Sequence, residues 1–265
     1  MNVYEVINQQ RYDELKQKGF RAIPTMNIFT VKPDEHGKPY RAKSRIVVLG
    51  NLEQRLWSNS ERYAPVLQSS SCQLLTSMAV EHGRILIQGD CKNAFCQPSL
   101  PDDEVVVCTP PAGCPRSAPN TYWLLKKTLY GLRRSPHHWF ERFVEVLVKQ
   151  MGFTQCANDP CMLEGTPIKG EPPIYIGIYV DDFIYFSKSD AVEKWFERTL
   201  KEHVKVEFMG SVSYFLGSRY VWYHTENGLA VHVSQPGFSE LLLERFGMSD
   251  ANPVKTPYRS GLVID

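Results

Sequence analysis

The chain has almost no net charge and no long apolar segment. Its 265 residues include 30 Lys and Arg against 29 Asp and Glu, which gives a formal net charge of +1. Whole-molecule attraction to a polyanion is therefore excluded, and any nucleic-acid site has to be a local basic patch. No segment approaches the ~20 consecutive apolar residues of a membrane-spanning helix. Residues 1–16 lack the apolar stretch of a signal peptide. We therefore expect an intracellular, soluble protein without membrane contact.

The sequence also lacks any C-x-x-C pair among its seven cysteines. An odd count without such pairs is typical of a reducing compartment and not of a disulfide framework. Cys91 and Cys96 share their spacing with Cys156 and Cys161, but no histidine stands at zinc-finger spacing, so no zinc site is expected. The hydrophobic content of 43% and the charged content of 22% describe an ordinary globular protein that can bury a core.

The most informative segment that is present is 174–188, IYIGIYVDDFIYFSK. Two runs of β-branched and aromatic residues flank Asp181 and Asp182, which predicts a β-hairpin with both carboxylates at its tight turn. Adjacent anions at the end of a buried sheet need a positive partner, and a divalent cation is the usual one. The pair Asp102-Asp103 has no such strand before it and is interpreted as a solvated turn. The hairpin therefore predicts a metal site.

Periodicity predicts a mixed order of helices and strands in the rest of the chain. A strand over 84–90 ends on Asp90. From residue 84 to about residue 215 the order is strand, helix, strand, strand, helix, strand, which is the split βαβ, ferredoxin-like plan. In that plan the first strand lies beside the central hairpin, so Asp90 is expected next to Asp181, with three carboxylates converging on one point. The other expected elements are a hairpin at 28–49, helices at 69–82, 135–151, from 190 and at 238–246, and strands at 105–108, 214–223 and 229–233.

Short local signals mark the ends of some of these elements. Ser135 is expected to cap its helix, with Pro136 in the first turn. Asp190 and Glu193 have the spacing of a capping box. Asn227-Gly228 is typical of a tight turn between two strands.

Two basic clusters are candidates for phosphate contacts. Arg41, Lys43 and Arg45 alternate along one expected strand and so share one face. The second cluster brackets a turn at 129–131. Its members are Lys126, Lys127, Arg133 and Arg134. Each cluster alone is more often a solvated surface, whereas beside a three-acid site we favour a nucleotide or nucleic-acid contact.

The expected acids suit a two-metal reaction at phosphorus. Two divalent ions held ~4 Å apart by shared carboxylates stabilise both the attacking and the leaving oxygen. One ion would lower the pKa of a primer 3′-hydroxyl, and the other would neutralise a triphosphate. We expect two Mg²⁺ ions, with Mn²⁺ as the alternative.

Many short motifs follow one another along the chain. They are Lys43-Ser-Arg45, Tyr63-Ala-Pro65, Asp90 to Phe95, Leu125 to Pro136, Asn158-Asp-Pro160, Tyr179 to Asp182, Tyr214 to Gly217, Ser234-Gln235, Arg245 to Met248 and Thr256-Pro257. In this order they closely resemble the reverse transcriptase of copia-type LTR retrotransposons. The resemblance covers nearly the whole chain from about Ile23, and the full set is far more specific than any one motif.

The resemblance implies an α+β fold, a right-hand polymerase with a ferredoxin-like (split βαβ) palm, fingers and a partial thumb. The implied parts are N-terminal fingers at 1–83, a palm at 84–96 and 131–223 with a fingers insertion at 97–130, and a connection to the partial thumb at 224–265. Asp90, Asp181 and Asp182 would be the polymerase acids. Asp90, Asp181 and the backbone carbonyl of Cys91 would hold the magnesium ions.

The resemblance also implies roles for residues around these acids. Lys43 and Arg45 would grip the incoming triphosphate, and Phe95 would stand against the ribose 2′ position. Tyr130 and Gly131 would lie under the nascent base pair. The implied contacts to template and primer are Lys126, Lys127, Arg133 and Arg134, together with a primer grip at Phe215, Leu216 and Gly217.

We therefore predict an RNA-directed and DNA-directed DNA polymerase whose partners are a primed RNA or DNA template and deoxynucleoside triphosphates. The family continues into ribonuclease H, so we expect the ribonuclease H and integrase parts of a polyprotein to be absent here. Family resemblance adds the expectation of a cytoplasmic, virus-like particle. One alternative is a catalytically weak or inactive nucleic-acid-binding remnant of a retroelement. Another is a different palm-type nucleotidyl transferase or cyclase.

Overall fold

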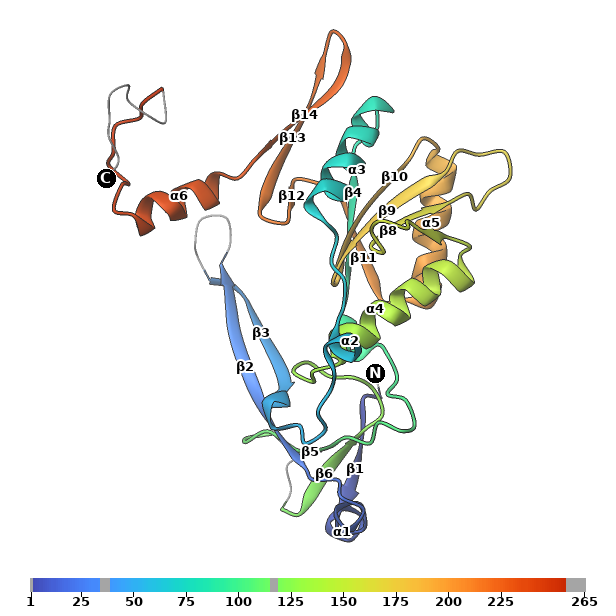
Figure 1. The fold of residues 1–265 in the computed structure, drawn as a ribbon, viewed down its shortest axis with the longest axis vertical. Coiled ribbons are helices and arrows are strands. Elements are labelled where there is room, and N and C mark those ends of the chain that lie inside the picture. The colour runs from blue at the N-terminus through green and yellow to red at the C-terminus, as the bar shows by residue number, and fades with distance from the viewer. Residues whose placement is uncertain (1, 34–38, 115–118, 256–265) are drawn as a thin grey trace. The chain divides into compact units, whose positions relative to one another are not determined.

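The structure is a computed structural model, and it describes residues 2–33, 39–114 and 119–255 (Figure 1). The chain divides into two compact units, Met1–Gly210 and Ser211–Asp265, each of which is described by itself. Five-stranded and six-stranded sheets precede a three-stranded sheet, so the mixed α+β class predicted from the sequence is confirmed. Within the described ranges, no helix is long and apolar enough to cross a membrane.

The six-stranded sheet has the split βαβ order that the sequence predicts. Its strands are β4 Ile87–Cys91, β7 Thr154–Gln155, β8 Met162–Gly165, β9 Ile174–Tyr179, β10 Asp182–Ser187 and β11 Val206–Ser211. The helices that accompany it are α3 Ser69–Glu81, α4 Ser135–Glu145 with a π-helical turn at Val146–Gln150, and α5 Asp190–His203. The strands lie in the order β11-β4-β10-β9-β8-β7, so β4 is a direct neighbour of the central hairpin.

Helices cover both faces of this sheet. Gly177 on β9 lies toward α3, because a Cβ added there would come within 3.3 Å of Leu75. Gly177 pairs with Ile184 on β10, so these two residues lie on the same face. Phe183 precedes Ile184 and therefore points to the opposite face. The Phe183 ring lies 5.7 Å from the ring of Phe143 on α4. The sheet is therefore buried on both sides and gives its ends a rigid support.

The last strand of this plan is not where the sequence predicts it. The prediction of 214–223 is wrong for this sheet, in which β11 occupies the edge position beside β4. None of the β11 residues is buried, and only Val206 and Phe208 alternate as half-buried apolar residues, so periodicity gives little signal. The predicted strand belongs instead to the three-stranded sheet, where a turn at Leu216-Gly217 divides it.

Both predicted helix caps also differ from the structure. Ser135 does not cap α4, because its Oγ donates to the carbonyl of Leu129 at 2.6 Å. Ser189 caps α5 in place of Asp190. Glu193 accepts a hydrogen bond from the amide of residue 187 and not from the cap residue. The helices start within one residue of the prediction, so the error concerns only the side chains that satisfy their first turns.

The five-stranded sheet contains the predicted N-terminal hairpin. Its elements are β1 Tyr4–Asn8, β2 Ile23–Pro33, β3 Pro39–Val48, β5 Val107–Thr109 and β6 Thr121–Leu125, with α1 Gln9–Gln17 between β1 and β2. The strand order is β1-β6-β5-β2-β3. The tip of the β2–β3 hairpin, at 34–38, lies outside the described residues. Three short helices follow in the connections, η1 Gly50–Leu52, α2 Asn59–Arg62 and η2 Ala94–Cys96.

The second unit is a small sheet followed by one helix. Its elements are β12 Tyr214–Phe215, β13 Ser218–Thr225, β14 Gly228–Ser234 and α6 Pro236–Arg245. Leu216 and Gly217 have φ values of +49° and +78°, which is the pattern of a type I′ turn. The tight turn predicted at Asn227-Gly228 lies one residue earlier, at Glu226-Asn227, because Gly228 already pairs with Thr225 and begins β14. The last predicted helix is confirmed. No residue of α6 is buried. The division of the whole chain into fingers, palm and thumb stays a prediction.

Candidate active site

The predicted acidic turn closes the β9–β10 hairpin. Its loop consists of Val180 and Asp181, and Asp182 begins β10. On the other side of β10, β4 pairs Asp90 with Asp182. The carbonyl of Asp181 also accepts a hydrogen bond from the amide of Cys91, at 2.7 Å. The structure therefore brings Asp90 next to the aspartate pair, as the sequence predicts, with Asp182 as its direct partner in the register.

Burial and neighbouring charges act on Asp90. Burial raises the pKa of its carboxyl above the ordinary value, and the charge of Asp181 raises this pKa further. Lys43 acts in the opposite direction, and Glu207 and Lys92 add smaller effects of opposite sign. Two half-buried carboxylates that repel each other are arranged to receive positive charge.

The residues fit a magnesium ion but do not form a closed cage. Among the described residues, no group of three or more His, Cys, Asp or Glu stands at metal-binding spacing. The three acids thus line one cleft but do not converge on one point, so that part of the prediction is wrong. Burial raises the pKa of the Cys91 thiol well above its usual value, so the thiol stays protonated and only its carbonyl is a suitable donor. Mg²⁺ prefers oxygen donors and keeps several waters, which suits the open donor set of Asp90, Asp181 and this carbonyl.

The acids line a cleft of ≈ 730 Å³ together with cations from β3. Lys43 and Arg45 stand two positions apart on β3, hence on one face, and both line this cleft, as does Tyr130. The side chain of Arg41 lies outside the described part of the chain. A larger open groove of ≈ 850 Å³ runs along α4, and none of the predicted acids lines it. The smaller cleft is therefore the candidate site, because it brings opposite charges together.

Tyr130 and Gly131 join the turn at 129–131 to β3. The carbonyl of Tyr130 accepts a hydrogen bond from the amide of Val48 at 2.8 Å. Gly131 has a φ of +91°, and a Cβ there would lie 2.0 Å from the carbonyl oxygen of Val48. Only glycine permits this close approach. The guanidinium carbon of Arg45 lies 5.7 Å from the centre of the Tyr130 ring, so the ring helps to hold this cation.

Phe95 contacts Tyr130, which lines the cleft, but does not line the cleft itself. The two rings meet edge to face, with centroids 5.2 Å apart. The carbonyl of Phe95 accepts a hydrogen bond from the hydroxyl of Thr128 at 2.7 Å, which fixes the backbone of η2. Phe95 is half-buried and is not among the residues that line the cleft. Its contact with the ribose 2′ position stays a prediction.

Arg133 and Arg134 bond inside the protein. The guanidinium of Arg133 donates to the carbonyl of Gly50 at 2.7 Å and to that of Asn51 at 3.1 Å. Arg134 forms an ion pair with Glu104. Their contact with nucleic acid stays a prediction, and these internal bonds leave fewer donors for phosphates.

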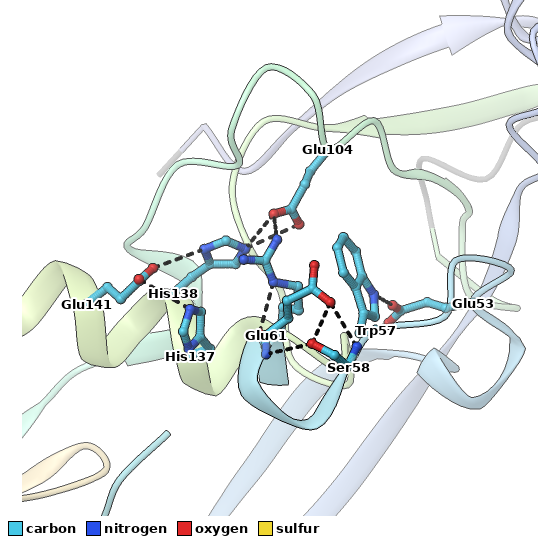
Figure 2. Close-up of polar contacts among 9 residues, drawn as sticks. Glu53, Trp57, Ser58, Glu61, Glu104, His137, His138 and Glu141 are labelled. Carbon is cyan, nitrogen blue, oxygen red and sulfur yellow. Dashed lines mark hydrogen bonds and ion pairs between the residues drawn. The ribbon is translucent and has the colours of Figure 1, made fainter. Parts of the chain in front are cut away.

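A buried carboxylate that the sequence analysis did not single out organises this region (Figure 2). Glu104 is 8% exposed, and its carboxylate contacts Nε2 of His138 at 3.2 Å as well as Arg134. Burial works against ionisation, but the bond to His138 and the charges of His138 and Arg134 outweigh it, so the pKa of Glu104 is lowered. The Trp57 ring lies 4.5 Å from the Arg134 guanidinium carbon, and its Nε1 donates to Glu53 at 2.9 Å. Glu104 follows the aspartate pair at 102–103, and the polar run gives no signal that its last member is buried.

The remaining predicted nucleic-acid contacts have local partners or lie in the second unit. Lys126 pairs with Glu5 at 2.9 Å, and Lys127 donates to the carbonyl of Gln97 at 3.1 Å. The predicted primer-grip residues form the end of β12 and the turn after it. They are Phe215, Leu216 and Gly217.

A second missed residue is Trp139 on α4. The sequence assigns it to the apolar face of a helix, and it is indeed 1% exposed. Its indole Nε1, however, donates to the carbonyl of Val180 in the acidic turn at 2.7 Å. Hydrophobic periodicity reports burial and carries no information about this single polar atom.

Comparison with known proteins covers nearly the whole chain. The family model described as "Reverse transcriptase (RNA-dependent DNA polymerase)" matches residues 3–260. The Retrovirus-related Pol polyprotein from transposon RE1 of Arabidopsis thaliana is 30% identical over 230 residues, which are 87% of this chain and 15% of that protein. The corresponding polyprotein from transposon TNT 1-94 of Nicotiana tabacum is 28% identical over 247 residues, 93% of this chain and 18% of that protein. The chain thus spans less than a fifth of the length of these relatives.

Solved structures give a weaker likeness. The foamy viral protease-reverse transcriptase in complex with an RNA/DNA hybrid is 17% identical, with a TM-score of 0.34, and the match covers 79% of this chain and 25% of that one. The foamy viral protease-reverse transcriptase dRH in complex with double-stranded DNA is 20% identical, with a TM-score of 0.32, over 77% of this chain and 29% of that one. Values this low add nothing to the fold described above.

Proposed function

Because the chain belongs to the reverse transcriptase (RNA-dependent DNA polymerase) family found in the Pol polyproteins of copia-type retrotransposons, we propose that it extends a primer with deoxynucleotides on an RNA or DNA template. One observation carries this proposal. Asp90, whose pKa is raised by burial and by the charge of Asp181, shares a cleft with Asp181, Lys43 and Arg45. Acids that can hold cations and cations that can hold phosphates are the two halves of a nucleotidyl-transfer site.

The acids would bind the metal ions. Asp90 and Asp181 offer carboxylate oxygens, and Cys91 offers its backbone carbonyl. Asp182 lies beside them and adds negative charge to the same cleft. Two Mg²⁺ ions, or Mn²⁺ in their place, would when bound lower the pKa of the primer 3′-hydroxyl and neutralise charge on the triphosphate.

Residues around the acids would bind and orient the nucleotide. Lys43 and Arg45 present charged donors on one face of β3, which suits the oxygens of a triphosphate. The Tyr130 ring supports Arg45 and, with Gly131, forms a surface on which a base pair can rest. Phe95 packs against the same ring and would limit space at the sugar 2′ position.

Template and primer would bind beyond this cleft. Lys126 and Lys127 are proposed contacts to phosphates, and the turn at 215–217 is the proposed primer grip. Arg133 and Arg134 would act mainly by fixing the turn at 129–131, given their internal bonds. We assign 1–83 and 97–130 to fingers, 84–96 and 131–223 to palm, and 224–265 to the connection and partial thumb. Location in a cytoplasmic virus-like particle is part of the same proposal.

Primer extension on an oligo-dT-primed poly-rA template with Mg²⁺ tests the proposal directly. Asp181→Asn should lower the rate about a thousandfold, which corresponds to ~4 kcal/mol of lost transition-state stabilisation. Binding of the primed template should stay equal or tighten, because one negative charge is gone. Asp102→Asn is the matched control, since Asp102 is an exposed member of the other aspartate pair and should change neither quantity. Near-normal extension by Asp181→Asn would refute the site assignment.

The second candidate function is that of a nucleic-acid-binding remnant of a retroelement without productive turnover. The observation in its favour is that the acids do not stand at the spacing of a closed metal site among the described residues. Tight binding of the primed template, with no extension in either Mg²⁺ or Mn²⁺, would support this candidate over the polymerase.

A further inference from the structure

The turn that carries Asp181 has a backbone conformation that its sequence disfavours. Val180 occupies the first loop position with a φ of +57°, whereas Asp181 has no positive φ. A positive φ at the first of two loop positions is the pattern of a type II′ turn, in which glycine is preferred. Valine is β-branched and rarely adopts this region, so surrounding contacts have to hold it there.

Two hydrogen bonds hold this turn from outside the hairpin. The indole Nε1 of Trp139 donates to the carbonyl of Val180 at 2.7 Å. The amide of Cys91 donates to the carbonyl of Asp181, also at 2.7 Å. The first bond comes from α4 and the second from the end of β4. The two peptide groups that flank the Cα of Asp181 are thus fixed by two different elements.

Trp139 is itself held firmly by the core. Its side chain is 1% exposed, and its ring stacks on Phe143 with centroids 5.2 Å apart and planes 17° apart. The Phe143 ring in turn lies 5.7 Å from that of Phe183, the residue after Asp182 on β10. The indole therefore reaches the turn from the same core that fixes β10.

We propose that Trp139 is a positioning residue for the acidic turn. Its N–H fixes the peptide plane before Asp181, and thereby sets the direction in which the Asp181 carboxylate leaves the backbone. Without this bond the plane can rotate about ψ of Val180 and φ of Asp181, which turns the carboxylate away from its metal-binding direction. The cost of the positive φ of Val180 is then no longer offset, and the turn loses its fixed conformation. The inference rests on the proposed function, because it takes Asp181 as a magnesium ligand.

Burial of the indole does not by itself account for this bond. Trp123 is fully buried as well, and its Nε1 has no hydrogen-bond partner among the described residues. The chain therefore tolerates an unpaired buried indole. Trp123 also offers a matched control, because its replacement by phenylalanine removes the same atoms from a core without removing a hydrogen bond.

The test compares Trp139→Phe with Trp123→Phe at a temperature where both variants are folded. Trp139→Phe should lower kcat about tenfold, which corresponds to ~1.4 kcal/mol of transition-state stabilisation, because the turn loses the bond that fixes its peptide plane. KM for nucleotide and the Kd for primed template should stay within about twofold of wild type. Trp123→Phe should leave all three values unchanged. An equal loss of kcat in both variants would overturn the proposal.

A second measurement does not depend on extension. Bound Mg²⁺ raises the thermal midpoint, and Trp139→Phe should need about fivefold more Mg²⁺ for the same rise, whereas Trp123→Phe should not. Val180→Gly in the Trp139→Phe chain should restore part of kcat and of the Mg²⁺ response, because glycine takes a positive φ without steric cost. No recovery would overturn the proposal. A wild-type protein that responds to Mg²⁺ but does not extend primers refutes the proposed function alone, and one that does neither refutes both.

Discussion

Burial and the charge of Asp181 raise the pKa of Asp90, while Lys43 offsets part of this effect. A carboxyl whose folded pKa is raised stabilises the fold only while it is protonated. That contribution is complete below the unfolded pKa and is lost as the pH rises through the folded pKa. At neutral pH, without a metal ion, ionised Asp90 therefore lowers the free energy of unfolding, as charges at functional sites commonly do.

Asp90→Asn should accordingly stabilise the metal-free protein at pH 7 while abolishing extension. The gain should shrink as the pH falls through the raised pKa of Asp90 and vanish below the ordinary value of 3.8. Urea unfolding at several pH values measures it. Addition of Mg²⁺ should stabilise wild type and leave Asp90→Asn unchanged. A variant that is less stable than wild type at pH 7 would contradict this account of the charge balance.

Phe95 gives a test of nucleotide selection. If its ring excludes a 2′-hydroxyl, Phe95→Val should raise ribonucleotide incorporation by orders of magnitude and change deoxynucleotide use much less. The cost in stability should be about 1–3 kcal/mol, since a half-buried ring is lost. The measurement is the ratio of kcat/KM for the two nucleotides, in which partial unfolding cancels. An unchanged ratio would show that Phe95 serves only as the edge-to-face partner of Tyr130.

The sequence predicts the acids better than it predicts what holds them. Asp90 and Asp181 stand out because carboxylates at the ends of apolar strands need a physical reason. Trp139 does not, because an apolar helix face accounts fully for a tryptophan. The left-handed conformation of Val180 runs against the preferences of its residue type, so tertiary contacts and not local sequence decide it.

Arg45 on β3 and Arg133 after the turn at 129–131 are expected to have different roles, the first in nucleotide binding and the second in stability. Arg45 lines the cleft, whereas Arg133 bonds to the carbonyls of η1. Arg45→Ala should raise KM for nucleotide about tenfold with little change in stability, because a charged donor to the triphosphate is lost. Steady-state kinetics and urea unfolding separate the two effects.

Arg133→Ala should show the reverse pattern. Loss of its bonds to Gly50 and Asn51 should lower the free energy of unfolding by about 1–3 kcal/mol. The salt dependence of template binding should not change. A flatter dependence, by about one unit of slope, would show that Arg133 contacts a phosphate after all.

Elements with a strong pattern are predicted well, and those without one are not. The β9–β10 hairpin is found because its strands are continuous runs of β-branched and aromatic residues, and α3 because its apolar residues recur at helical spacing. β11 is missed because it is an edge strand with no buried residue, held by its pairing with β4. Edge strands depend on backbone hydrogen bonds to a neighbour that no local window contains.

The split βαβ order of the main sheet follows from the order of elements, because few topologies satisfy the handedness and connection rules. The boundary between the two units does not. The predicted palm runs to 223, whereas the compact first unit ends at Gly210. Local composition does not change at this point, and only the contacts of the folded chain separate the units.

A chain that ends at Gly210 should fold but not extend primers. The shortened chain keeps the five-stranded sheet, the six-stranded sheet except for Ser211 at the end of β11, and the core clusters around Trp123 and Tyr12, whereas α6 has no buried residue. The thermal midpoint should therefore stay close to that of the full chain, and unfolding should remain cooperative. Mg²⁺ should still raise the midpoint, because Asp90 and Asp181 are retained.

Affinity for primed template should fall at least tenfold, since the proposed primer grip at 215–217 is removed. Circular dichroism, a Mg²⁺ titration and template binding measure these quantities, and a truncated chain that is unfolded, or that extends primers at the full rate, would contradict this division of roles.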